Sequence, residues 1–176
     1  MHAFILSVTV VLLLISCQAK EVNVMETVAS VDLNRYLGKW YEIATIPQRF
    51  QLGCHCVTAE YSLRPDGKVK VVNSCRKDSP TGPPKSVTGQ AKVVKGSNNA
   101  KLKVSFFWPF WGNYWIINLD QENYQWAIVS APSRKTLWIL SRTPEMDAAL
   151  YEKLVEFCKD TGLNTELLLK TDQSCH

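Results

Sequence analysis

The chain has 176 residues, a formal charge of +4 and 46% hydrophobic residues, which suits one globular domain with an ordinary core. Its lysines are spread along the chain and form no basic cluster, so nucleic acid is excluded as an expected partner. The sequence has neither a glycine-rich phosphate loop nor the spacing typical of a metal site. We therefore expect no cofactor and no bound metal.

The first residues form a short apolar leader. Residues 4–15 are almost uninterrupted in their apolar character but too few to span a bilayer, which is typical of a signal peptide. Residues 14–17 read Leu-Ile-Ser-Cys, the form of a bacterial lipobox. The sequence thus predicts a lipoprotein signal peptide over 1–16, a solvated tether over 17–30 and one domain over 31–176.

Acyl chains on Cys17 would anchor the mature protein to a membrane. Gln18 is not the aspartate that typically retains lipoproteins in the inner membrane, so we expect an anchor on the periplasmic side of the outer membrane. The alternative is an ordinary signal peptide that is cleaved after Ala19, which would make the protein a secreted one.

After the tether, the chain begins with one helical turn and continues as strands. Residues 32–38 predict a turn with Asp32 as N-cap and Gly38 as the terminating glycine. Alternating apolar and polar residues between turn sequences then predict eight antiparallel strands. These are 39–45, 57–63, 68–73, 86–94, 101–106, 114–119, 124–130 and 136–141. A helix should follow, with Thr143 as N-cap, Pro144 at its first position and Gly162 after its end.

Eight short strands and one late helix favour an all-β fold, an antiparallel up-and-down β-barrel with the C-terminal helix packed outside. A filled β-sandwich is the alternative. Small residues should alternate with aromatic ones along the inner wall and leave room for one small ligand. The small residues are Ala44, Ala59, Gly89 and Ala91, and the aromatic ones are Tyr61, Phe106, Tyr114, Trp126 and Trp138.

Six cysteines in an exported chain predict disulfides. Five remain once Cys17 is assigned to acylation, so one of them should stay unpaired. Cys158 falls on the apolar stripe of the predicted helix and is the expected free thiol. The other four are expected to pair, and the residues alone leave the connectivity open.

Four separated segments resemble the lipocalin family, in particular its bacterial outer-membrane lipoproteins and apolipoprotein D. The segments are 34–44, which includes Gly38-Lys39-Trp40-Tyr41-Glu42, then 57–63, 102–107 and 137–144. They agree with the family in residue type, order and spacing. The resemblance implies that Trp40, at the start of the first strand, stacks on Arg142, at the end of the last one, and closes one end of the barrel through a cation-π contact.

The resemblance also implies a function, since the family binds lipids in its barrel. We expect a fatty acid or lysophospholipid as partner, and storage, transport or clearance of lipid in the cell envelope as the role. The expected ligand-binding residues are Ala44, Tyr61, Phe106, Tyr114, Ile116 and Trp138.

The same resemblance implies a disulfide between Cys56 and Cys175, like the bridge that fastens the C-terminal tail in apolipoprotein D. Cys54 would then pair with Cys75. Exchange of the near neighbours Cys54 and Cys56 is the alternative connectivity.

Residues 107–113 hold four aromatic side chains in five positions, on a loop that we expect near the mouth of the barrel. Such a loop is typical of an apolar rim for lipid or membrane. It leaves open a second class of function, an envelope interaction protein or homodimer that uses this loop. An enzyme is not expected, because none of the three histidines, His2, His55 and His176, is predicted inside the barrel to activate a nucleophile.

Overall fold

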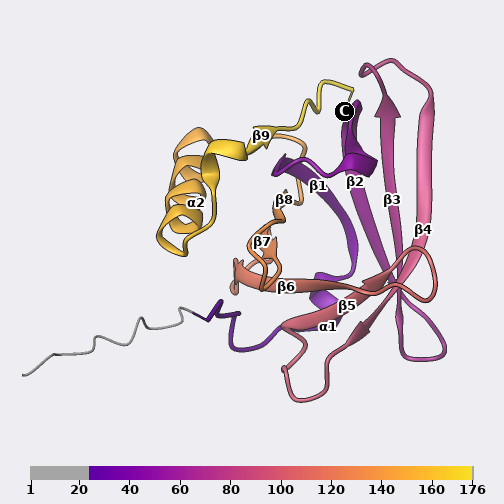
Figure 1. Ribbon diagram of the computed structural model, residues 1–176, viewed down its shortest axis with the longest axis vertical. Coiled ribbons are helices and arrows are strands. Elements are labelled where there is room, and N and C mark those ends of the chain that lie inside the picture. The colour runs from indigo at the N-terminus through magenta and orange to yellow at the C-terminus, as the bar shows by residue number, and fades with distance from the viewer. Residues whose placement is uncertain (1–23, 176) are drawn as a thin grey trace, which may run out of the picture.

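The computed structural model describes residues 24–175 and shows a closed antiparallel β-barrel (Figure 1). Neighbours along the chain pair from β2 through to β8, and β1 closes the barrel by pairing with both β8 and β2. The strands are β1 Gly38–Thr45, β2 Cys54–Leu63, β3 Val69–Lys77, β4 Pro84–Val93, β5 Lys101–Ser105, β6 Gly112–Leu119, β7 Trp126–Ser130 and β8 Leu137–Ser141. This arrangement confirms the predicted barrel, and the sandwich alternative is wrong.

Short helices and one small strand complete the fold. The helix α2 (Ala148–Asp160) lies outside the barrel, beside the strands β7, β8 and β1 (Figure 1). The other elements are α1 Leu33–Tyr36, η1 Arg49–Gln51, η2 Thr165–Leu167 and β9 Leu169–Lys170. Within residues 24–175, no helix has the length and apolar character needed to cross a membrane.

The start of α2 differs from the prediction. Its N-cap is Asp147, whose carboxylate accepts a hydrogen bond from the Leu150 N–H at 2.9 Å. The predicted N-cap, Thr143, instead donates its hydroxyl to the Glu145 carbonyl at 2.6 Å. The aspartate satisfies one of the free N–H groups of the first turn, so the helix begins four residues later than predicted.

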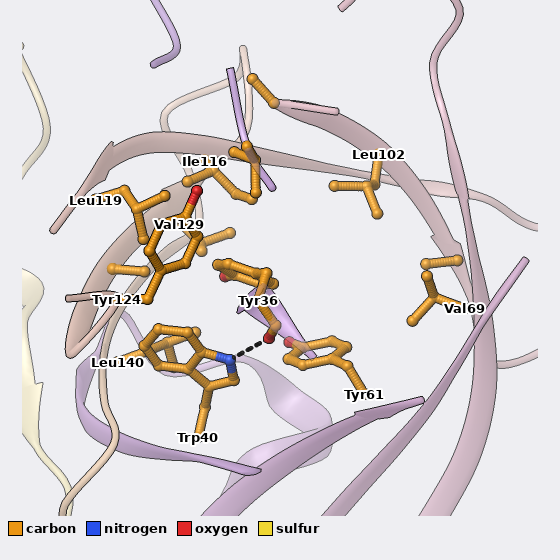
Figure 2. Close-up of a cluster of buried hydrophobic side chains, with 14 of the residues drawn as sticks. Tyr36, Trp40, Tyr61, Val69, Leu102, Ile116, Leu119, Tyr124, Val129 and Leu140 are labelled. Atoms are coloured by element: carbon orange, nitrogen blue, oxygen red, sulfur yellow. Dashed lines mark hydrogen bonds between the residues drawn. The ribbon is translucent and has the colours of Figure 1, made fainter. Parts of the chain in front are cut away.

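Strand alternation divides the apolar side chains into two clusters. The inner cluster fills the barrel and includes Tyr36, Trp40, Tyr61, Leu102, Ile116 and Leu140 (Figure 2). The outer cluster lies between the barrel wall and α2, and it includes Ile43, Ile128, Ile139, Leu154 and Cys158. Cys158 is a free, fully buried thiol, and its burial raises its pKa to about 12.

Residues 24–30, the described part of the expected tether, pack on the barrel. Met25 is buried in the outer cluster, and Val28 packs against the inner one. The Val28 N–H donates to the Ile116 carbonyl at 3.0 Å, which holds the segment to β6. Met25 and Val28 thus contact the barrel because their apolar side chains find a surface to cover, while Val24, Glu26, Ala29 and Ser30 stay exposed, and the tether over 17–30 stays a prediction. Cys17 and the predicted signal peptide lie outside the described residues.

The C-terminal tail fills a gap in the barrel wall. Pairing between β1 and β2 ends at Tyr41 and Thr58, beyond which the two strands diverge. The tail enters there: the Thr171 N–H donates to the Ile43 carbonyl at 2.9 Å, and the Cys56 N–H donates to the Asp172 carbonyl at 2.7 Å. The tail thus substitutes for the missing ladder between the two strands.

Two disulfides fasten this part of the molecule. They join Cys54 to Cys75 and Cys56 to Cys175, the pairing that the family resemblance implies. The first links the paired strands β2 and β3, and the second fixes the tail to β2. The prediction placed the start of β2 at residue 57, because a bulge between His55 and Thr58 interrupts the alternation near these cysteines.

Candidate functional site

One end of the barrel is closed by Trp40 and Arg142. The guanidinium carbon of Arg142 lies 3.8 Å from the centroid of the Trp40 ring, close enough for a cation-π contact. The Arg142 N–H groups donate to the backbone carbonyls of Lys39, Arg35 and Tyr124 at 2.8, 2.6 and 3.2 Å. Trp40 is fully buried, and its indole N–H donates to the Tyr36 carbonyl at 2.8 Å (Figure 2). The pair thus makes a rigid, fully hydrogen-bonded base.

The opposite end is the mouth, because alternate connections of an antiparallel meander lie at the same end. Its four connecting loops are 46–53, 78–83, 106–111 and 131–136. Two of them carry large apolar side chains in solvent. These are Phe50 and Leu52 between β1 and β2, and Phe107, Trp108 and Phe110 between β5 and β6. Trp108 is the most exposed of them, at 82%.

Five of the six predicted ligand-binding residues lie in the inner cluster: Tyr61, Phe106, Tyr114, Ile116 and Trp138. Tyr61 and Ile116 are buried, whereas Phe106, Tyr114 and Trp138 keep part of their surface accessible. Since inward side chains of a filled barrel would be fully enclosed, this accessible surface indicates that solvent reaches the interior from the mouth.

Ala44 does not lie in the barrel, so its assignment to the ligand site is wrong. A bulge between Glu42 and Ala44 shifts the register of β1 against β8, so Ala44 pairs with Ile139 and faces the outer cluster. Trp126 also packs in the outer cluster, contrary to the prediction. Pure alternation cannot detect a bulge, which reverses the facing of every residue after it.

Gly89 leaves less room than the sequence suggested. A Cβ atom at this position would meet the ring of Phe106 at 2.6 Å, so the aromatic side chain occupies the space that the glycine leaves. The close approach of Phe106 therefore requires the glycine. It also narrows the interior on the side of β4.

The deeper part of the interior holds a narrow cavity beside three tyrosines, Tyr36, Tyr61 and Tyr114. The cavity has about 10 Å³ of room for the centre of a water-sized sphere. Its remaining lining is apolar and consists of Leu33, Leu37, Val69, Ala91, Leu102 and Val104. Figure 2 shows Tyr36 and Tyr61 beside Trp40, with Val69 and Leu102 across the interior.

The three tyrosine hydroxyls meet at Tyr114. Its oxygen lies 2.8 Å from that of Tyr36 and 2.9 Å from that of Tyr61. Burial raises the pKa of all three phenols, that of Tyr61 to about 12, because a phenolate would be poorly solvated there. The cluster is therefore neutral at physiological pH. Sequence analysis missed Tyr36, because its side chain enters the barrel from α1, outside the pattern of alternating strands.

Glu42 was also missed, although it occupies the inner position next to Trp40 along β1. Among residues 24–175, it is the charged residue that is buried, with 4% of its surface exposed. Its carboxylate accepts hydrogen bonds from Gln51 of η1 and Thr171 of the tail, both at 2.7 Å. Burial raises the pKa of Glu42, while these two hydrogen bonds lower it and offset part of the effect.

This carboxylate links the mouth to the wall of the cavity. The side-chain amide oxygen of Gln51, Oε1, also accepts a hydrogen bond, at 3.4 Å, from the indole N–H of Trp138. The contacts of Glu42 therefore connect the β1–β2 loop, the C-terminal tail and one inner aromatic side chain. The sequence does carry a signal for Glu42, because a charged residue at an inward position of a strand is unusual.

His55 lies apart from the barrel interior, where its ring nitrogen contacts the Asp172 carboxylate at 3.3 Å. No group of metal-ligating side chains occurs within the described ranges. The polar side chains that line the cavity are phenols, and none of them is paired with a histidine or carboxylate base. The arrangement suits the binding of an apolar molecule better than general acid–base chemistry.

Known proteins resemble the chain over most of its length. A family model described as a lipocalin-like domain matches residues 31–173. The outer membrane lipoprotein Blc of Vibrio cholerae is 42% identical over 149 residues, which cover 85% of this chain and 86% of that protein. Temperature-induced lipocalin-1 of Arabidopsis thaliana is 40% identical, with 85% and 83% covered. Apolipoprotein D of Mus musculus is 36% identical, with 81% and 77% covered.

Solved structures show the same fold at lower identity. Insecticyanin from the tobacco hornworm Manduca sexta superposes with a TM-score of 0.66, at 22% identity, over 84% of both chains. Lobster apocrustacyanin A1 gives a TM-score of 0.63 at 20% identity, over 80% of this chain and 78% of the other.

Proposed function

The chain belongs to the lipocalin family, and on that premise we propose that its barrel holds one long-chain lipid, a fatty acid or a lysophospholipid. The role that fits is storage, transport or clearance of such lipids. The observation that carries the proposal is the inner wall. It is closed at one end by Trp40 and Arg142, it is mostly apolar, and it stays partly accessible from the mouth.

Burial of the acyl chain supplies the driving force. Each methylene group that leaves water contributes about 0.8 kcal/mol, so a sixteen-carbon chain contributes roughly 12 kcal/mol before the costs of ordering and association. The exposed apolar side chains of the two mouth loops extend this surface outward. A dissociation constant of 1 μM corresponds to about 8.2 kcal/mol, so micromolar binding follows if about two thirds of that free energy is retained.

Titration of oleate and of an oleoyl lysophospholipid into delipidated protein tests the proposal. We expect saturable binding of one molecule and a change in tryptophan fluorescence. Trp138→Ala should weaken binding about tenfold, since losing about 50 Å² of apolar contact costs close to the 1.4 kcal/mol that a factor of ten represents. The matched control is Trp126→Ala on the outer face of β7, which should leave affinity unchanged.

Thermal melts of both variants separate stability from binding. Binding that survives Trp138→Ala unchanged would contradict the assignment of this wall to the ligand. No saturable binding by the wild type would instead favour the second candidate function, an interaction protein that uses the apolar loops at the mouth. The exposure of Phe107, Trp108 and Phe110 is the observation behind that alternative.

We further propose that the mature chain is anchored through acylated Cys17 in the outer membrane, with secretion as the alternative. The lipobox form of residues 14–17 supports this, as does the name of the Vibrio cholerae relative, an outer membrane lipoprotein. Intact mass of the protein extracted from membranes checks it. The expected mass is that of residues 17–176 plus acyl groups, whereas an unmodified chain beginning at Lys20 would contradict it.

A further inference from the structure

The three tyrosine hydroxyls beside the cavity carry an inference that rests on the proposed lipid-binding function. They come from three separate elements, since Tyr36 ends α1, Tyr61 lies on β2 and Tyr114 lies on β6. All three hydroxyls belong to one chain of hydrogen bonds with Tyr114 at its centre. The rest of the cavity lining is apolar, so these hydroxyls are the polar side-chain groups of this cavity.

The cluster has more hydroxyl hydrogens than hydrogen bonds. Each neutral phenol carries one hydrogen, and the raised pKa values keep all three phenols neutral. Two hydrogen bonds use two of the three hydrogens. No other side chain or backbone group of the described residues forms a hydrogen bond with these hydroxyls, so one hydrogen stays available.

Tyr114 is best placed to offer that hydrogen. Tyr36 and Tyr61 are buried, whereas Tyr114 keeps accessible surface inside the barrel. Either hydroxyl of each pair can donate; in the arrangement in which Tyr36 and Tyr61 both donate to the two lone pairs of the Tyr114 oxygen, the Tyr114 hydrogen is the one left for a ligand. A hydroxyl that accepts two hydrogen bonds is polarised by them and donates more strongly.

The volume and the lining of the cavity restrict which group can accept this hydrogen. The cavity has room for the centre of about one water-sized sphere, so only the terminal group of a longer molecule fits there. An oxygen attached to an apolar body fits both the donor and the apolar wall. No charged residue lines the cavity, so a carboxylate there would have no counter-charge in direct contact with it.

We propose that Tyr114 donates a hydrogen bond to a neutral oxygen, a hydroxyl or a carbonyl, at the end of the lipid that enters the barrel first. The apolar body of the ligand then lies along the inner wall toward Trp138 and the mouth. A charged group at the other end of the lipid stays near solvent. The preferred ligand class is a long-chain lipid with an oxygen at its buried end.

Two acids that differ by one oxygen test this subsite: hexadecanoate and 16-hydroxyhexadecanoate, each titrated into delipidated protein. In the wild type, the dissociation constant of the hydroxy acid should be at most about three times that of hexadecanoate, because its terminal hydroxyl finds a hydrogen-bond partner. Tyr114→Phe should weaken the hydroxy acid about tenfold to a hundredfold relative to hexadecanoate, because the hydroxyl is then buried without a partner.

Two further variants separate donation from packing. The double variant Tyr36→Phe and Tyr61→Phe removes the two neighbouring hydroxyls but keeps the Tyr114 donor. It should therefore retain the wild-type ratio of affinities for the two acids. Tyr151→Phe on the external helix α2 is the matched control. Circular dichroism and thermal melts show which variants are folded at the temperature of the titration.

Three results would overturn the subsite while leaving the proposed function intact. The first is a wild type that binds the hydroxy acid ten times more weakly than hexadecanoate. The second is a ratio of the two affinities that Tyr114→Phe leaves unchanged. The third is an equal loss of affinity for both acids in Tyr114→Phe, which would place the carboxylate of the lipid at the tyrosines. Failure of the wild type to bind either acid would overturn the proposed function and the subsite together.

Discussion

Trp40→Ala should lower the free energy of unfolding by about 3 to 5 kcal/mol, the range found when a large aromatic side chain is lost from a core. Trp40 is fully buried, and its ring lies between the guanidinium of Arg142 and the ring of Tyr36, whose centroid is 4.9 Å away. Its removal leaves a void at the closed end and takes the platform from Arg142. Urea unfolding of the variant and the wild type measures the loss.

The matched control is Trp115→Ala on the outer face of β6. Trp115 also has a cation above its ring, with Lys101 Nζ 4.2 Å from the centroid, but it is only partly buried. An exposed cation-π contact is worth about 0.5 to 1 kcal/mol, so the control should lose clearly less stability. Equal losses in the two variants, or a loss below 1 kcal/mol for Trp40→Ala, would contradict the assigned role of the closed end.

Stability and ligand choice should respond differently at this end of the barrel. Trp40 is absent from the lining of the cavity, so the folded fraction of Trp40→Ala should bind lipid with nearly the wild-type affinity. Arg142→Lys should have an intermediate effect on stability, because an ammonium group lacks the planar fork that serves three carbonyls at once. The closed end therefore acts through stability of the barrel.

The barrel itself could be predicted because its signals are local and repeated. Inward residues alternate along most strands, so Tyr61 on β2, Tyr114 on β6 and Trp138 on β8 were all placed correctly in the interior. The contact between Trp40 and Arg142 followed from two short segments at the ends of the barrel. The strand positions depended on residue type and spacing, whereas the contact between Trp40 and Arg142 was implied by the resemblance to the lipocalin family.

The features that escaped prediction depend on distant parts of the chain or on interrupted alternation. The bulge in β1 turned Ala44 outward, and no residue type in that strand signals a bulge. Glu42 is tolerated in the interior because Thr171, far along the chain, donates to its carboxylate. The tyrosine cluster likewise needs Tyr36 from a helical turn that precedes the barrel, so its geometry exists only in the folded chain.

The C-terminal tail illustrates the same point, since its place in the wall follows from one disulfide and several polar contacts. Gln173 donates to the carbonyls of Glu42 and Val57 at 2.8 and 2.9 Å, one on each side of the gap between β1 and β2. Thr171 holds the Glu42 carboxylate, which in turn contacts Gln51 at the mouth. Release of the tail would therefore open the wall and free the β1–β2 loop.

Loss of the bridge between Cys56 and Cys175 should accordingly destabilise the protein more than loss of the bridge between Cys54 and Cys75. The first closes a loop with a sequence separation of 119 and the second one of 21. The chain-entropy model gives about 5 kcal/mol and about 3 kcal/mol for loops of these lengths. The tail also loses its hold on the gap between β1 and β2 when the first bridge is absent.

Double alanine variants of each pair, unfolded in urea without reductant, measure the two losses. The pair Cys56→Ala and Cys175→Ala should lose more stability and become sensitive to proteolysis after residue 170, because the freed tail is exposed. The matched hairpin pair, Cys54→Ala and Cys75→Ala, should keep the tail protected. A larger loss in the hairpin pair, or a tail that stays protected without its bridge, would mean that hydrogen bonds from residues such as Gln173 hold the wall closed by themselves.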